Sequence, residues 1–389
     1  MRSPVGRRFL GLVVMAAMVG PGCAPGRAEV TPTPSWAGTG ELRIEAVRIP
    51  VVPGPDGPPA YELEGLVVRP AGDGRFPIAL VTHGTPRDGA SIRSMSARSL
   101  ERQARNLARR GWAAAVVLRR GYGTSGGTLQ SAGPSCDAPD YARAAGEDAR
   151  DLVGALAWLR GQDYADPSRP ALAMGGSAGG IAVLALAATR PPGLGAVVSL
   201  AGGRGSPSPG VVCAPERLVA AVRGFGTAAG SGLPTLWLYA SNDRFFGPEL
   251  AGWMHAAWSA GGGAAELVML PPYGEDGHFV YVQEAGAPLW WPPLDRFLAA
   301  HGMPSRHAIP GRVTPDAGLN AASRASFEDY LSRSAEKAFA VGPRGASGWA
   351  AGRATVEDAA RGALSNCEAH AGTAPGSCRL QALNFSRVR

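Results

Sequence analysis

The chain reads ALAMGGSAGG over residues 171–180. The apolar start of this stretch predicts a buried β-strand over 171–175, and the small residues of 177–189 predict a helix directly after it. Between the two lies Gly-x-Ser-x-Gly, whose glycines permit a sharp strand-to-helix turn that projects the Ser177 hydroxyl into a cleft. Ser177 is therefore a candidate nucleophile. The alternative is a glycine-rich helix start in which Ser177 is only the N-cap.

The sequence on both sides of this turn alternates between strand-like and helix-period segments. Such alternation predicts an α/β fold with a mostly parallel sheet and helices on both faces. Expected strands cover residues 42–52, 61–68, 77–82, 112–118, 171–175, 194–200, 234–240 and 265–270, and expected helices cover 96–110, 141–160, 177–189, 248–259 and 289–300.

A serine hydroxyl needs a base, usually a histidine that a carboxylate orients. Asp243 follows the expected strand 234–240, and His278 lies in the loop after the expected strand 265–270. Both positions are at the carboxyl ends of strands, where ligands bind in open α/β sheets. We expect His278 to be the base and Asp243 its orienting acid. The alternatives are a turn or cap role for Asp243 and an exposed loop position for His278.

The other five histidines fit the base less well. His83 precedes Ser177, His255 lies inside a helix, and the remaining three lie near or beyond the end of the expected sheet: His301, His307 and His370. Asp276 is so close to His278 in sequence that Asp243 is the better orienting acid.

Acyl chemistry at Ser177 also needs two backbone donors for an oxyanion. We expect the N–H of Ala178, after the nucleophile, and the N–H of Thr85, in the loop after strand 77–82. His83 is expected to support that loop. Tyr122 either lines the substrate pocket or packs the turn after strand 112–118.

Composition excludes several other classes of protein. The formal charge is +7, and its arginines are scattered rather than gathered in a basic run, so no nucleic-acid partner is expected. The segment 119–127 lacks the spacing of a phosphate loop. Neither the cysteines nor the acidic residues have metal-site spacing, so no metal site is assigned.

The N-terminus has the pattern of an export signal. Arg2, Arg7 and Arg8 precede a short apolar run over 9–19, which is too short for a stable membrane span. The signal is processed in one of two ways, by lipidation at Cys23 or by cleavage after Ala28. The third possibility is an uncleaved cytoplasmic N-terminus. Membrane attachment is expected only through a lipid at Cys23, and the protein is expected in the periplasm, in the cell envelope or outside the cell.

Without Cys23, four cysteines remain, and an even number in an exported protein predicts disulfides. Cys367 is expected to pair with Cys378, which leaves Cys136 with Cys213. The expected organisation is a signal at 1–28, a linker at 29–40, a main domain at 41–303 with a lid over about 202–232, and a small C-terminal disulfide-bearing α/β module at 313–389.

Five elements occur together in a familiar order: the loop at His83, the RGYG-x-S-x-G segment at 120–127, the serine motif, Asp243 and His278. Residues 41–303 therefore resemble α/β hydrolases of the dienelactone hydrolase-like and prolyl oligopeptidase-like group. The resemblance implies an eight-stranded sheet, a Ser-His-Asp triad and no cofactor. Dienelactone hydrolases use a cysteine where this chain has Ser177, so lactone specificity is not carried over. The C-terminal part resembles small disulfide-bearing modules of exported bacterial proteins and implies no activity or named partner.

These features predict a serine hydrolase that acts on a small carboxylic ester or related acyl compound through an acyl-enzyme. A peptidase or amidase with the same triad is the first alternative. A cell-envelope binding protein with a vestigial hydrolase domain is the second.

Overall fold

The computed structural model describes residues 42–52, 60–133, 135–305, 314–315, 317–333, 336–353, 355–384 and 386–388. The expected signal segment, including Cys23 and Ala28, and the linker lie outside these residues. Across the described residues, no helix combines the length and apolar character needed to cross a membrane.

The main sheet has eight strands in the order β1-β2-β4-β3-β5-β6-β7-β8. Strands β1 and β2 are antiparallel to each other, β2 is antiparallel to β4, and the remaining neighbours are parallel. The strand bounds are β1 Leu42–Val51, β2 Tyr61–Pro70, β3 Ile78–Thr82, β4 Ala113–Val117, β5 Ala171–Gly176, β6 Leu194–Leu200, β7 Thr235–Ala240 and β8 Ala265–Leu270. This order, with a nucleophile turn after β5, is the α/β-hydrolase fold that the resemblance implied.

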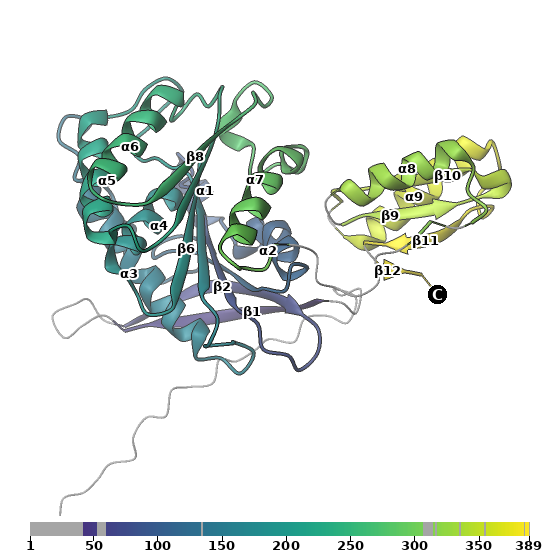
Figure 1. Ribbon diagram of the computed structural model, residues 1–389, viewed down its shortest axis with the longest axis horizontal. Helices are drawn as coiled ribbons and strands as arrows, with labels where there is room; N and C mark the ends of the chain where they lie inside the picture. Colours follow the sequence, from purple (N-terminus) through teal and green to yellow (C-terminus); the bar gives the residue numbers. More distant parts are fainter. Residues whose placement is uncertain are drawn as a thin grey trace, which may run out of the picture.

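Helices cover both faces of this sheet (Figure 1). One apolar core lies under α3, α4, α5 and α6, and a second lies under α2 and α7. The helix bounds are α1 Gly89–Arg93, α2 Glu101–Ala108, α3 Tyr141–Arg160, α4 Ala178–Thr189, α5 Pro215–Ala229, α6 Pro248–Ala260 and α7 Ala287–Ala300. The central strands are buried on both faces and read as continuous apolar runs, as expected for a covered parallel sheet.

The expected lid over 202–232 needs correction. Residues 215–229 form helix α5, which connects β6 to β7 and packs against α4 and α6. Its apolar side chains Leu218, Val222 and Phe225 follow helical spacing and are buried in the core. Only the segment before α5 lies over the cleft, so the covering element is a short loop.

The C-terminal part forms a second, four-stranded sheet with the strand order β10-β9-β11-β12. Its elements are α8 Ala321–Ser332, β9 Ala338–Val341, β10 Ser347–Ala350, α9 Val356–Ala371, β11 Arg379–Leu383 and β12 Ser386–Arg387. Phe339 and Val341 pack with α8, whereas Ala338 and Ala340 pack with α9, so the two helices use opposite faces of β9.

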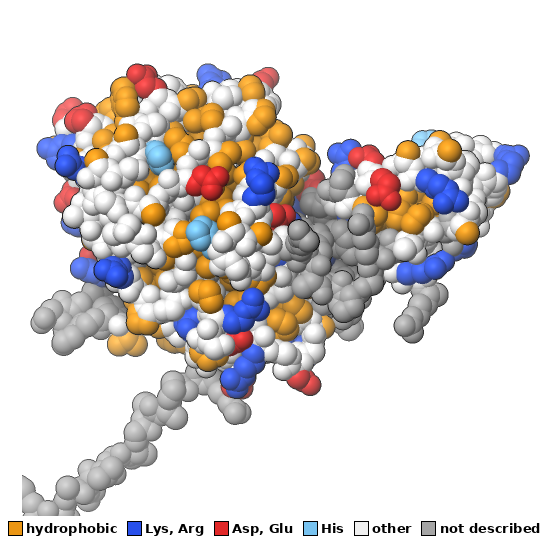
Figure 2. All heavy atoms as spheres, in the orientation of Figure 1, with side chains coloured by type: hydrophobic (Ala, Val, Ile, Leu, Met, Phe, Trp, Pro, Cys, Tyr) orange, Lys and Arg blue, Asp and Glu red, His pale blue; other side chains and the backbone are white. Residues whose placement is uncertain are grey.

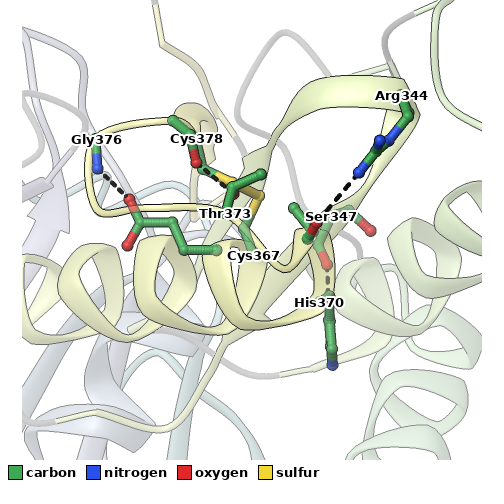
Figure 3. Close-up of a disulfide and its surroundings, with 10 residues drawn as sticks. Arg344, Ser347, Cys367, His370, Thr373, Gly376 and Cys378 are labelled. Atoms are coloured by element: carbon green, nitrogen blue, oxygen red, sulfur yellow. Dashed lines mark hydrogen bonds between the residues drawn. A yellow bond between two sulfur atoms is a disulfide. The ribbon is translucent and has the colours of Figure 1, made fainter.

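A disulfide between Cys367 and Cys378 joins the end of α9 to the start of β11 (Figure 3). The intervening turn is held by Gly376 N–H, which donates to Glu368 Oε1 at 2.6 Å, while His370 Nδ1 lies 2.9 Å from Ser347 O. Glu336, just before β9, is paired with Arg105 of α2 at 3.0 Å. This ion pair connects the C-terminal part to the main domain.

Charged side chains are distributed without a dominant sign on the face drawn in Figure 2. Lysine and arginine side chains lie singly or in small groups there, and acidic side chains lie among them. The scattering that the sequence shows for its arginines is therefore also visible on this surface.

Candidate active site

Ser177 lies at the turn between β5 and α4 with φ 53° and ψ −123°. A positive φ is uncommon for a residue with a side chain and costs on the order of 1–3 kcal/mol, which the surrounding structure must offset. Two of the backbone bonds at the turn tie it to the neighbouring strand β6 and the residues after it: Ser177 N–H donates to Leu200 O, and Gly203 N–H donates to Ser177 O. The Ser177 hydroxyl makes no capping bond to α4, so the alternative of a simple N-cap is not what the structure contains.

Glycines around Ser177 are required by close packing. A Cβ at Gly175 would lie 2.3 Å from Gly179 O, and a Cβ at Gly179 would lie 2.5 Å from His83 O. A Cβ at Gly176 would lie 1.9 Å from the ring of Tyr281. The backbone of the turn is therefore enclosed from three sides, which is how it maintains the strained residue.

We expect Gly176→Ala to lower the free energy of unfolding by roughly 3 kcal/mol, because the buried Tyr281 ring has to move. Chemical denaturation followed by circular dichroism measures the loss. Gly224→Ala is the matched control: Gly224 is exposed on α5 and its Cβ would meet no atom within 4 Å. The control should be unchanged or slightly more stable. Equal stability of the two variants would mean that the turn is not tightly enclosed.

Asp243 and His278 come together at the carboxyl ends of β7 and β8. His278 Nδ1 lies 3.0 Å from Asp243 Oδ2, and both residues are buried. The second carboxylate oxygen of Asp243, Oδ1, accepts from the N–H groups of Phe245 and Phe246 at 2.8 and 2.9 Å. With Oδ1 held by two amides, Oδ2 faces the imidazole. An acceptor at Nδ1 favours the tautomer that carries its proton there and leaves Nε2 free to accept one.

The imidazole of His278 is surrounded by aromatic rings. Phe245 lies 4.6 Å away between ring centroids, Phe279 5.5 Å away and Phe246 5.6 Å away. Asp276 supports the same loop from outside, because its Oδ1 accepts from His278 N–H at 3.0 Å and from Arg244 N–H at 3.1 Å. Asp276 therefore contacts the backbone of His278, whereas Asp243 contacts its ring.

The two expected oxyanion donors lie beside Ser177 in one cavity. Ala178 is the first residue of α4, so its N–H has no partner within the helix. The loop before Thr85 runs against the nucleophile, since a Cβ at Gly84 would lie 3.0 Å from Ser177 Cβ. The Thr85 hydroxyl is 2.6 Å from the hydroxyl of Tyr122, which fixes the loop. Tyr122 is buried and also lines the cavity, so it has both of the roles considered for it.

A known family matches part of the chain. Residues 56–232 match the family model described as X-Pro dipeptidyl-peptidase (S15 family), a match that includes Ser177 and ends before Asp243 and His278. The chain has the α/β-hydrolase fold. No curated protein matches the sequence.

Solved structures similar to this hydrolase include both esterases and peptidases. An acetyl xylan esterase from Paenibacillus sp. R4 is 18% identical, with 64% of this chain and 85% of that chain covered and a TM-score of 0.46. An esterase from Pyrococcus furiosus is 13% identical, with coverages of 67% and 90% and a TM-score of 0.44. An acylaminoacyl peptidase from Pyrococcus horikoshii is 15% identical, with 71% of this chain but only 43% of that chain covered and a TM-score of 0.44.

Sequence reasoning missed a buried charge network behind the loop that contains His83 and Thr85. Arg119 donates to His83 O at 2.7 Å and to Thr82 Oγ1 at 2.9 Å, and its Nε lies 3.3 Å from Asp148. Asp148 also accepts from Arg204 at 2.6 Å, and Arg204 lines the cavity. Through Arg119 and Arg204, Asp148 thus links the loop at His83 to the cavity wall. No local motif brings these three residues together, so only the fold reveals them.

His83 is neutral and structural in this network. Its Nδ1 lies 2.7 Å from Gly84 O, and its Nε2 accepts from Arg119 N–H at 3.1 Å. Burial, and secondly the nearby Arg119 charge, hold the pKa of His83 well below its usual value near 6.5. Both ring nitrogens are occupied by the backbone, which fits the supporting role expected for this residue.

The lowered pKa of His83 predicts that the folded protein loses stability in mild acid. Below about pH 6.5 the unfolded chain protonates His83 while the folded hydrolase keeps it neutral, so stability falls as the pH drops toward the lower folded-state pKa. We expect His83→Gln to be less stable at pH 8 but to have a shallower slope of stability between about pH 6.5 and 5. Denaturation of the wild type and of His83→Gln at several pH values across that range measures both slopes. Parallel curves of stability against pH would contradict a neutral, buried His83.

The cavity of the hydrolase has a volume of about 900 Å³ and opens over Ser177 and His278. Two loops form its outer walls, around residues 129–139 and 203–213. A disulfide between Cys136 and Cys213 joins these loops, and the hydroxyl of Tyr141 donates to Cys213 O. The short covering loop that replaces the expected lid is therefore tied to the opposite wall.

Removing this disulfide should affect both stability and substrate binding. We expect the double variant Cys136→Ser and Cys213→Ser to lose about 2–4 kcal/mol of stability, because the bond closes a long loop of chain. We also expect KM to rise several-fold with a smaller change in kcat, because the walls move while the triad stays. The double variant Cys367→Ser and Cys378→Ser is the matched control, and its KM should equal that of the wild type.

Proposed function

We propose that this hydrolase cleaves carboxylic esters or related small acyl compounds, with Ser177 as the nucleophile. The observation that carries the proposal is the hydrogen bond between His278 and Asp243 beside a strained Ser177 in the same cavity. A serine, a histidine with a free Nε2 and a carboxylate that fixes the histidine tautomer are the parts that acyl transfer requires.

The proposed reaction has two halves. Nε2 of His278 takes the Ser177 proton as the oxygen attacks the ester carbonyl, and the N–H groups of Ala178 and Thr85 stabilise the resulting oxyanion. The protonated imidazole then gives its proton to the leaving alkoxide, and the acyl group remains on Ser177. Water attacks this acyl-enzyme, loses a proton to His278, and releases the carboxylic acid as the Ser177 oxygen regains the proton.

The charges of the cavity favour an ester over a peptide with a free N-terminus. Among the described residues, the arginine and carboxylate side chains that line the cavity are Arg87, Arg204 and Asp276. Arg204 shares the single carboxylate of Asp148 with Arg119, and an oxygen of Asp276 accepts two backbone N–H groups. Arg87 lies over the ring of Phe245 at 4.0 Å. With two arginines and one aspartate, this lining carries more positive than negative charge, which disfavours a peptide ammonium.

The second candidate is release of dipeptides from peptides with proline at the second position, and the match to the S15 family model favours it. The two candidates share Ser177 and differ in the group that leaves. Purified protein is assayed with nitrophenyl acetate and butyrate and with Ala-Pro-p-nitroanilide.

Ester turnover that exceeds anilide turnover by at least about a hundredfold supports the ester proposal. Anilide turnover that exceeds ester turnover by the same factor would instead support the peptidase as the function. Turnover of both substrates that survives Ser177→Ala would exclude both candidates.

Export to an oxidising compartment is proposed with this function. Two disulfides in the described chain support it, because structural disulfides persist mainly outside the reducing cytosol. Expression of the full chain, with and without Cys23→Ala, followed by fractionation and mass spectrometry of the N-terminus, tests both cleavage and lipidation. Full-length protein in the cytosolic fraction with an intact Met1 would overturn the proposal.

A further inference from the structure

The main domain has a second pocket, of about 460 Å³, at the end of the sheet opposite Ser177. It lies between β1, the end of β2, the turn at 72–74 and the segment after α3. Phe76 N–H donates to Tyr164 O at 2.8 Å, and Phe76 forms a bridge with Ala165 just before β3 begins. The pocket is therefore built on regular, fixed backbone at the amino ends of the parallel strands.

Two buried hydrogen-bond donors in this pocket have no acceptor within the described part of the chain. The side chain of Arg69 is only 8% exposed, and its Nε makes no hydrogen bond. The buried hydroxyl of Tyr164 also makes none. Buried polar groups are nearly always satisfied by protein, water or ligand, so these two donors point to an acceptor that the chain does not supply.

The remaining contacts of Arg69 are long. Its Nη1 is 3.4 Å from Gly72 O, its Nη2 is 3.5 Å from Glu45 Oε1, and its guanidinium lies 5.2 Å from the centre of the Tyr164 ring. Burial, with Glu45 as the second cause, raises the pKa of the Tyr164 hydroxyl, so it keeps its proton for donation. Arg69 and Tyr164 both line the pocket, and their unpaired donor atoms lie just beneath its surface.

The rest of the lining decides which kind of acceptor fits. Arg43 lies directly opposite Arg69 in the strand pair, but three carboxylates line the same pocket: Glu45, Asp73 and Asp163. Two arginines against three carboxylates do not favour an anion. A partly exposed Trp158 adds a flat apolar surface. Donors, acceptors and an aromatic face together suit a neutral ligand whose hydroxyls both accept and donate.

We propose that this pocket binds a neutral carbohydrate, with hydroxyl oxygens accepting from Arg69 and Tyr164 and one sugar face against Trp158. The volume lies in the lower half of the range of about 300–1,000 Å³ that small-molecule sites occupy, which is suited to one or two sugar rings. The proposal does not depend on ester hydrolysis, because the pocket and Ser177 lie at opposite ends of the sheet.

Binding is tested on the full chain carrying Ser177→Ala, so that turnover cannot alter the probe. Cellobiose, maltose and N,N′-diacetylchitobiose are titrated one at a time by calorimetry and by saturation-transfer NMR, with glucuronate and inorganic phosphate as anionic probes. We expect at least one disaccharide to bind and neither anion to bind more tightly than it.

Variants locate the binding. Tyr164→Phe removes only the hydroxyl and should weaken binding about five- to tenfold, the equivalent of one hydrogen bond. Trp158→Ala should abolish it, whereas Trp253→Ala, a half-exposed tryptophan on α6 outside the pocket, should leave it unchanged. Thermal unfolding checks that each variant folds.

Three results would overturn the proposal: no disaccharide binds, Tyr164→Phe and Trp158→Ala bind as well as the wild type, or the anions bind in place of the sugars.

Discussion

Ser177→Ala is expected to reduce ester hydrolysis by at least about 10⁴-fold in kcat/KM, leaving only what the oxyanion donors and the cavity supply. The hydroxyl is the atom that forms the acyl bond, and nothing else in the turn can replace it. The change removes one oxygen from a residue whose hydroxyl makes no capping bond, so the fold should persist. Initial rates with nitrophenyl butyrate measure the loss.

Ser206→Ala is the matched control for this experiment. Ser206 lines the same cavity from the covering loop, and its hydroxyl donates to Ser208 O rather than to the triad. Its rate should stay within about threefold of the wild type. Similar losses in both variants would mean that the cavity wall, and not a nucleophile, limits the reaction.

Asp243→Asn is expected to lower kcat by about 10⁴-fold with little change in stability. Oδ1 of Asp243 accepts two backbone N–H groups, so the asparagine oxygen should take that position and its NH₂ should face His278. An NH₂ donor at Nδ1 selects the wrong tautomer, with the proton on Nε2, and this imidazole cannot accept the Ser177 proton. The loss should diminish as rising pH deprotonates the serine without help.

Asp276→Asn distinguishes the two carboxylates near His278. Asp276 contacts the backbone of His278 and not its ring, so an amide oxygen can replace the carboxylate oxygen with a loss of about tenfold or less. Losses of equal size for Asp243→Asn and Asp276→Asn would contradict the assignment of Asp243 as the residue that orients the His278 ring.

Much of the sheet was predictable because its central strands are buried on both faces. The ranges 194–200 and 265–270 agree with β6 and β8, and 141–160 agrees with α3. These segments combine strong apolar patterning with glycine or proline at their ends, which are local signals. The turn at Ser177 was predictable for the same reason, since its glycines are adjacent in sequence.

Features that depend on tertiary contacts were not predictable. A helix was expected over about 214–223, but the packing of α5 against α4 and α6 depends on tertiary contacts, so the helix was mistaken for part of a lid. Arg119, Asp148 and Arg204 are far apart in sequence, and both arginines are buried against the one carboxylate of Asp148. The unpaired donors of Arg69 and Tyr164 likewise become visible only when the pocket around them is formed.

Labelling with a fluorophosphonate tests the central claim most directly, because the probe reacts with a serine only when a base activates it. Peptide mass spectrometry of the labelled full chain should place the phosphonate on Ser177, with no labelling of Ser177→Ala and strongly reduced labelling of His278→Gln. A chain that stays unlabelled, or that carries the label on another serine, would contradict the assignment of Ser177 as an activated nucleophile.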